Sequence, residues 1–143
     1  MPIIRRAAPK DQESLQRLYI AVVSQAHWLP ESSRQSTSLQ SLTQGELIFV
    51  SCSEGDQILG FISIYEQASF IHHLYVSPES QGRGIGRELL QSLDTWLPKP
   101  WNLKCVTSNT KALRFYAAGG WAAICEAEGP DGKYSLLRKT SEA

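Results

Sequence analysis

The alternation of apolar and polar positions along the chain predicts a protein built from strands and helices. Short runs of β-branched and aromatic residues between turn residues predict strands, and apolar positions three and four residues apart predict helices. The predicted strands are 3–6, 47–52, 58–65, 70–76, 102–106, 121–127 and 133–139. The predicted helices are 11–26, 85–97 and 109–118, and Leu39 and Leu42 indicate a further short one.

This order of elements predicts an α/β (α+β) fold, in which a mixed, mostly antiparallel sheet of about seven strands is flanked by about four helices. Strands 47–52, 58–65 and 70–76 follow one another through short turns, so they are expected to be antiparallel. Strand 102–106 follows 70–76 through a helix and is expected to run parallel to it. The 143 residues fit one domain, 1–143.

The stretch from residue 69 to residue 97 is where we expect the chemistry, because it reads as a strand, a glycine turn and a helix in succession. A glycine turn that opens a helix leaves backbone N–H groups unpaired at the positive end of the helix dipole, which suits a phosphate or pyrophosphate. A Walker loop would continue with Gly-Lys-Ser/Thr, but Arg87 and Glu88 follow Gly86 here. A dinucleotide-binding fingerprint would place its third glycine one residue later. Both of these common nucleotide loops are therefore disfavoured.

The amino-acid composition limits the classes of partner that the protein could bind. Lysine plus arginine and aspartate plus glutamate each number 14, and no block of like charge occurs, so neither nucleic acid nor a membrane surface is expected as a partner. Cys52, Cys105 and Cys125 match no zinc spacing and are expected to be small apolar residues in a reducing cytosol. No apolar run approaches a membrane span, so a cytoplasmic protein is expected.

Two motifs together resemble the GCN5-related N-acetyltransferase (GNAT) superfamily. The first is Gln81-x-x-Gly84-x-Gly86 after the strand 70–76. The second begins at Asn109 and reads N-x-x-A-x-x-F-Y-x-x-x-G-W to residue 121. Its residues Asn109, Ala112 and Tyr116 are three and four positions apart and therefore share one helical face. The order of elements also agrees with this family, so the resemblance covers essentially the whole chain.

The resemblance implies that acetyl-CoA is the cofactor. In the family the two parallel strands splay apart, the pantetheine arm pairs with the backbone of the first of them, and the glycine loop holds the pyrophosphate. The adenosine end is then expected near Arg83 and Arg87. The residues that match these cofactor-binding positions are Leu74, Tyr75, Val76, Gln81, Gly82, Arg83, Gly84, Ile85, Gly86, Arg87, Asn109, Ala112 and Tyr116.

The implied reaction is direct attack of a primary amine on the acetyl thioester, and it needs a base because an alkylammonium is mostly charged at neutral pH. His72 is the candidate base, with His73 or a water relay as alternatives. Tyr116 matches the family's general acid, and a backbone N–H near Tyr75 or Val76 is the candidate donor to the oxyanion. Strict alternation places His72 and His73 on opposite faces of the strand, so no metal site is expected.

The acceptor is expected to be an amine of a small molecule or a peptide. Its selection falls in this family to the loop after the first helix, the polar segment 32–44 and the last hairpin. Trp28 is a candidate wall of the substrate pocket, and Glu126, Glu128 or Asp131 could attract an ammonium group. The main alternative is a non-catalytic acyl-CoA-binding regulatory module on the same scaffold, and a second is a domain without cofactor. The accepted acyl length stays open, as does the choice between monomer and homodimer.

Overall fold

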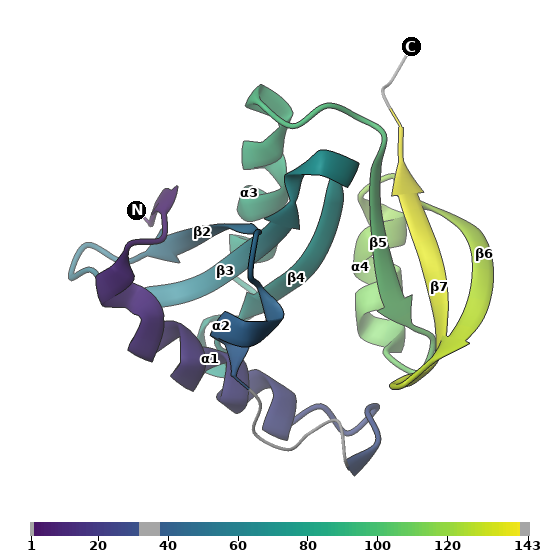
Figure 1. Ribbon diagram of the computed structural model, residues 1–143, viewed down its shortest axis with the longest axis horizontal. Helices are drawn as coiled ribbons and strands as arrows, with labels where there is room; N and C mark the ends of the chain where they lie inside the picture. Colours follow the sequence, from purple (N-terminus) through teal and green to yellow (C-terminus); the bar gives the residue numbers. More distant parts are fainter. Residues whose placement is uncertain (1, 32–37, 141–143) are drawn as a thin grey trace.

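The protein is a seven-stranded mixed sheet flanked by helices, as the sequence predicts (Figure 1). The computed structural model describes residues 2–31 and 38–140. Of the polar segment 32–44, residues 32–37 therefore lie outside the described residues. The strands are β1 (Ile3–Arg6), β2 (Leu47–Cys52), β3 (Ile58–Tyr65), β4 (Phe70–Val76), β5 (Trp101–Val106), β6 (Ala122–Gly129) and β7 (Gly132–Lys139), and their order in the sheet is β1-β2-β3-β4-β5-β7-β6.

The helices are α1 (Gln12–Ser24), α2 (Leu39–Leu42), α3 (Ile85–Ser92) and α4 (Thr110–Ala118). α1 begins one residue later than expected, because the Asp11 carboxylate does not cap the helix but binds Arg5 and the Ala8 N–H. α3 is shorter than expected, since the chain tightens into a 3₁₀ turn over Leu93–Thr95 before the prolines. α4 is capped as expected by the Asn109 side chain.

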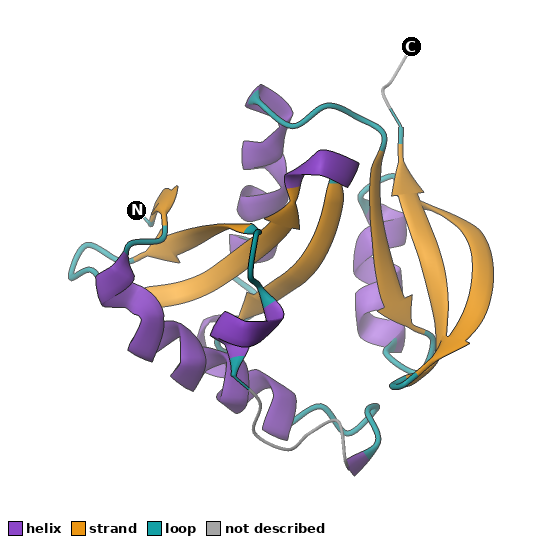
Figure 2. Ribbon diagram, in the orientation of Figure 1, coloured by secondary structure: helices purple, strands orange, loops and turns teal. Residues whose placement is uncertain are grey.

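Two apolar clusters hold the helices to the sheet, and Figure 2 colours the helices and the strands separately. The first joins α1 and α2 to β2 and β3 through Leu15, Leu18, Tyr19, Val23, Leu39, Val50 and Phe61. The second joins α3 and α4 to β3, β4 and β5 through Ile62, Ile64, Ile71, Ile85, Leu89, Leu103 and Tyr116. Because neighbouring side chains of a strand point to opposite faces, Phe61 and Ile62 belong to different clusters. The sheet is thus covered on both faces.

The strands β4 and β5 run parallel but pair over a short length only (Figure 1). Phe70 pairs with Asn102 and Ile71 with Leu103, and beyond these residues the two strands diverge. β5 pairs instead with β7 along its whole length, while β4 pairs with β3. The backbone of β4 from His72 onward therefore has no strand beside it on the β5 side, as the splayed geometry requires.

The cysteines agree with expectation in two of three cases. Cys52 and Cys105 are buried free thiols, but Cys125 is an exposed one because β6 is the edge strand of the sheet. Within the described ranges, no helix combines the length and the apolar character needed to cross a bilayer.

Candidate active site

The turn between β4 and α3 is shaped by two glycines. Gly82 has φ +84° and Gly84 has φ +80°, a left-handed conformation that strains other residues. A Cβ added at either position would meet no heavy atom of the described chain within 4 Å, so the space above the turn is open. Gly86 is different: it lies inside α3, where a Cβ would make ordinary contacts with Phe115 and Val76. The first two glycines, rather than all three, set the shape of this turn.

The same turn opens a helix, and the first backbone N–H groups of a helix have no carbonyl partner within it. α3 begins at the buried Ile85, and its N-cap is Gly84, which has no side chain to bind them. The side-chain amide of Gln81 donates to the Val76 carbonyl at 3.2 Å and so ties the turn to the end of β4. Arg83 and Arg87 are exposed on either side of the helix start. Unpaired amides, the helix dipole and two cations together suit a diphosphate.

The last residues of β4 divide between the two faces of the sheet. Tyr75 stacks on Tyr19 of α1 with ring centroids 5.9 Å apart and an interplanar angle of 23°. Leu74 and Val76 pack against the opposite cluster, beneath α3 and α4. All three β4 residues are half-buried. Their backbone groups on the β5 side are therefore available to a ligand that lies along the strand as an added strand would.

α4 carries Tyr116 toward the place where β4 and β5 part. The Asn109 carboxamide oxygen accepts from the Ala112 N–H at 3.2 Å, which fixes the start of the helix. Tyr116 is 9 % exposed, and its ring meets that of Trp121 edge-on at 5.6 Å. Burial raises the pKa of the Tyr116 phenol above its ordinary value, and the nearby Tyr75 raises it further. The hydroxyl therefore keeps its proton well above neutral pH.

A β-bulge brings the two histidines of β4 together, which corrects the expectation that they lie on opposite faces. Ser63 of β3 pairs with His73 and the next residue, Ile64, pairs with Ile71, so His72 is an extra residue in the ladder. A bulge breaks the alternation of side chains. The rings of His72 and His73 consequently lie 3.9 Å apart between centroids, tilted by 34°.

The two histidines differ in their environment. His73 is 8 % exposed, and its Nδ1 lies 2.8 Å from the Ser63 hydroxyl. Burial, with a smaller contribution from His72, lowers the pKa of His73 to about 3. The His72 side chain is 37 % exposed, and its Nδ1 lies 2.7 Å from Oε2 of Glu46. His73 is therefore a weak base, whereas His72 has both access to solvent and a carboxylate partner.

Both the sequence and the fold of this chain are similar to those of known proteins. Residues 12–121 match the sequence model of the Acetyltransferase (GNAT) family. The chain belongs to this family. The agreement extends over the helices, the glycine turn and the Tyr116 helix described above.

Individual relatives of the GNAT family agree with this assignment. Aminoglycoside N(6')-acetyltransferase type 1 of Stenotrophomonas maltophilia is 26% identical over 107 residues, which is 66% of this chain and 67% of that protein. The peptidyl-lysine N-acetyltransferase YiaC of Escherichia coli K12 is 34% identical over 71 residues, or 50% of this chain and 47% of that protein.

Solved structures show the same fold. The solution structure of apo YjaB from Escherichia coli has a TM-score of 0.78 and 23% identity, with 96% of this chain and 97% of that chain covered. YncA from Salmonella typhimurium, solved with acetyl-CoA, has a TM-score of 0.74 and 16% identity, with 100% and 95% covered.

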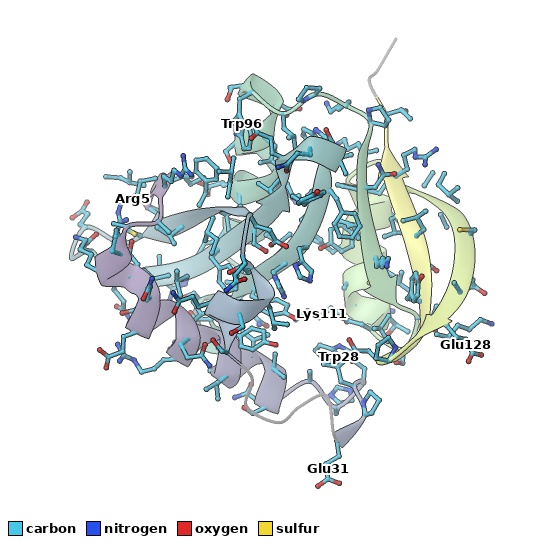
Figure 3. All side chains as sticks on the ribbon, viewed as in Figure 1. Arg5, Trp28, Glu31, Trp96, Lys111 and Glu128 are labelled. Carbon is cyan, nitrogen blue, oxygen red and sulfur yellow. The ribbon has the colours of Figure 1, made fainter. Side chains whose placement is uncertain are left out.

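Trp28, the residue expected to wall a substrate pocket, lies in the loop after α1, and this loop is tied to Ser108, which follows β5. The Trp28 carbonyl accepts from the Ser108 hydroxyl at 2.9 Å, and the ring packs edge-on against His27. Figure 3 shows the half-buried Trp28 side chain on the side of the molecule where β6 and β7 are joined.

Of the three acidic candidates on the last hairpin, Asp131 is near enough to α1 and β4 to influence two of their tyrosines. It contributes to the raised pKa of both Tyr19 and Tyr75. Glu126 is paired with Lys133 at 3.2 Å, and Glu128 is exposed. Burial is the main cause of both raised pKa values, and Asp131 adds to it.

Sequence reasoning missed Glu46, Ser63 and Tyr19. Glu46 precedes β2 by one residue and is separated from His72 by 26 positions in the chain. Nothing in its local pattern distinguishes it from other acidic residues at strand starts. Tyr19 lies among the buried apolar residues of α1, and its contact with His73 depends on how α1 packs on β4.

Proposed function

We propose that this GNAT protein transfers the acetyl group of acetyl-CoA to a primary amine of a small molecule or peptide, by direct attack in a ternary complex. The observation that carries the proposal is the divergence of β4 from β5 beside a glycine turn that opens α3. This arrangement provides an unpaired strand edge and an anion site in line with each other. An extended ligand with a diphosphate at one end matches both features.

Each part of the cofactor has a proposed contact. The diphosphate binds the amides of residues 81–86, and Arg83 and Arg87 attract its charge. The pantetheine arm pairs with the backbone of Leu74–Val76. The Asn109 cap and the face of α4 that carries Ala112 and Tyr116 line the other side. The similar fold of YncA, whose structure was solved with acetyl-CoA, supports this assignment.

The chemistry follows from groups at the apex, where β4 and β5 part. The acceptor ammonium first gives a proton to one of the two histidines or to a water held by them. The amine then attacks the thioester carbonyl, and a β4 backbone N–H near Tyr75 or Val76 stabilises the oxyanion. The C–S bond breaks, and the second amine proton reaches the leaving sulfur with the help of Tyr116. Because the pKa of Tyr116 is raised, this phenol is present as the hydrogen-bond donor throughout the neutral range.

Cofactor binding is tested by thermal unfolding with acetyl-CoA, CoA and ATP. A ligand at 100 times its Kd stabilises the native state by about 2.7 kcal/mol, a shift of several degrees for a chain of this length. We expect a shift with both CoA compounds and none with ATP. Gly84→Val should abolish the shift, because valine is strained at φ +80°. Normal acetyl-CoA binding by this variant would show that the loop is placed wrongly.

Catalysis is tested with Tyr116→Phe and an amine panel that contains a lysine peptide and an aminoglycoside, the acceptor classes in the names of two relatives. We expect kcat to fall about 100-fold, since general acid catalysis contributes about this much. The Kd for acetyl-CoA should stay within about twofold, because the ring remains. Tyr65→Phe at an exposed site is the matched control. Normal CoA binding without thiol release across the whole panel would favour the non-catalytic regulatory module.

A further inference from the structure

The bulged histidines have a third neighbour that comes from another part of the chain. Glu46 lies between α2 and β2, and β3 separates β2 from β4 in the sheet. Its side chain must therefore span β3 to reach His72 at 2.7 Å. Ser63 is the β3 residue opposite His73, and its hydroxyl is hydrogen-bonded to His73. This small side chain therefore lies beside the two histidines.

Glu46 is a buried carboxylate with incomplete hydrogen bonding. Its side chain is 9 % exposed. Oε2 is bound to His72 Nδ1, while Oε1 is buried and has no hydrogen-bond partner in the part of the chain that the structure describes. Burying an unpaired carboxylate oxygen costs free energy, so such a group indicates a role other than stability. The negative charge of Glu46 is directed at His72.

We propose that Glu46 is a positioning residue that holds the Nδ1–H of His72, so that Nε2 of His72, and not of His73, accepts the proton of the substrate amine. The inference rests on the proposed acetyl transfer and names its base. A carboxylate bound to Nδ1–H fixes the tautomer in which Nε2 carries the lone pair, and it stabilises the imidazolium that forms. His73 cannot serve equally well, because it is buried and its Nδ1 is already bound to Ser63.

The proton balance of this step is complete. The acceptor ammonium gives one proton to Nε2 of His72, which becomes an imidazolium with N–H groups on both nitrogens. Glu46 keeps its hydrogen bond to Nδ1–H throughout the step. The freed amine lone pair forms the new C–N bond, and the imidazolium later releases its proton to solvent. His72 reaches solvent because it is 37 % exposed.

Glu46, His72 and His73 resemble a set of metal ligands, but the distance between Glu46 and His72 favours a hydrogen bond. One nitrogen of each histidine and one oxygen of Glu46 lie within 4.8 Å of one another. Two ligands of a tetrahedral zinc ion are about 3.3 Å apart, given bonds of about 2.0–2.1 Å. The Glu46–His72 separation of 2.7 Å is shorter than this and is typical of a charge-assisted hydrogen bond.

The kinetic test is Glu46→Gln, measured with acetyl-CoA and whichever of the lysine peptide or the aminoglycoside the wild type acetylates. We expect kcat/KM at neutral pH to fall about 10- to 100-fold, with the Kd for acetyl-CoA unchanged. The pH profile should also differ from that of the wild type, because the substitution replaces the carboxylate bonded to Nδ1 of His72 at 2.7 Å, while the neighbouring His73 stays neutral at these pH values. Glu13→Gln, in an exposed helical ion pair, is the matched control.

A second measurement needs no substrate. The Nδ1–H proton of His72, assigned by its loss in His72→Asn, should resonate downfield in the wild type and shift upfield in Glu46→Gln. An unchanged resonance, or a folded Glu46→Gln enzyme with wild-type kcat/KM and pH profile, overturns the proposal. Activity lost on EDTA dialysis and restored by Zn²⁺ also overturns it, in favour of a metal site. If Glu46→Gln does not fold, Glu46→Asp is measured in the same two ways.

Failure of this inference is distinguishable from failure of the proposed function. If the wild type releases no thiol with any amine, the acetyl transfer itself is wrong, and the role of Glu46 in it fails too. If the wild type is active and Glu46→Gln equals it, acetyl transfer stands and only the assignment of Glu46 is wrong.

Discussion

The side chains of Asp11 and Glu46 are both little exposed, but their hydrogen bonding differs. Asp11, at the start of α1, accepts two hydrogen bonds from the Arg5 guanidinium at 2.7 and 3.0 Å and one from the Ala8 N–H at 2.7 Å. Glu46, beside β2, is bound to one ring nitrogen of His72 and keeps a buried oxygen without a partner in the described ranges. The two side chains are almost equally buried, at 6 % and 9 % exposed.

The difference separates a structural ion pair from a functional one. The guanidinium of Arg5 holds the pKa of Asp11 below its ordinary value, so this carboxylate is ionised at neutral pH. Its hydrogen bonds join β1 to the start of α1. The carboxylate of Glu46 is only partly hydrogen-bonded. Its one bonded oxygen contacts His72, which is near the apex and exposed. Burial alone therefore does not identify the functional carboxylate, whereas its hydrogen bonding does.

The largest expected effect on stability is that of Asp11→Asn. Removing one charge of a buried pair costs about 3 kcal/mol, and roughly 10 °C in Tm for a chain of this length. We take the lower end of the usual range because Arg5 keeps Asp56 as a partner at 3.1 Å. Chemical denaturation checks this, with Asp94→Asn in an exposed pair as a control that should change little. Unchanged stability of Asp11→Asn would contradict the structural role.

Acid should affect the two regions in different pH ranges. The native pKa of His73 is about 3, against about 6.5 when unfolded, so only the unfolded state binds a proton between these values. Stability is therefore full above pH 6.5 and falls by about 1.4 kcal/mol per pH unit below it, until His73 itself protonates. The pKa of Asp11 is lowered from 3.8, so its contribution to stability should be lost only as the pH falls below 3.8.

His73→Asn tests this separation, since the asparagine amide can still bond to Ser63. The free energy of unfolding, measured with urea between pH 7 and pH 4, should lose most of its slope in the variant. His27→Asn, at an exposed histidine, should retain the wild-type slope. If His73→Asn keeps the slope as well, the acid sensitivity comes from another group.

The smallest expected effect is that of Glu46→Gln on stability. The substitution removes a buried charge of which one oxygen lacks a partner, so the free energy of unfolding should change by less than about 1 kcal/mol. The same denaturation experiment as for Asp11→Asn measures it. A loss as large as that of Asp11→Asn would mean that Glu46 is also structural, and the contrast between the two carboxylates would disappear.

Much of this architecture follows from local patterns in the chain. Runs of β-branched and aromatic residues between turn residues predicted all seven strands, with ends within two residues of those observed. The helix that follows Asn109 was found because its cap and its apolar spacing lie within nine residues of sequence. The positive-φ glycines of the cofactor loop are likewise visible as a short motif. Such features depend on residues near one another, so periodicity and turn chemistry reveal them.

The arrangement at the apex could not be obtained in the same way. Alternation predicted that His72 and His73 point apart, but the bulge at His72 depends on the register of β3 against β4. The sequence alone determined the family, the order of elements and the two motifs, because these are encoded locally. Only the tertiary structure decided that Glu46 reaches His72 across β3 while Ser63 holds His73. Those contacts join residues 26 and 10 positions apart, and packing of the sheet, not local propensity, brings them together.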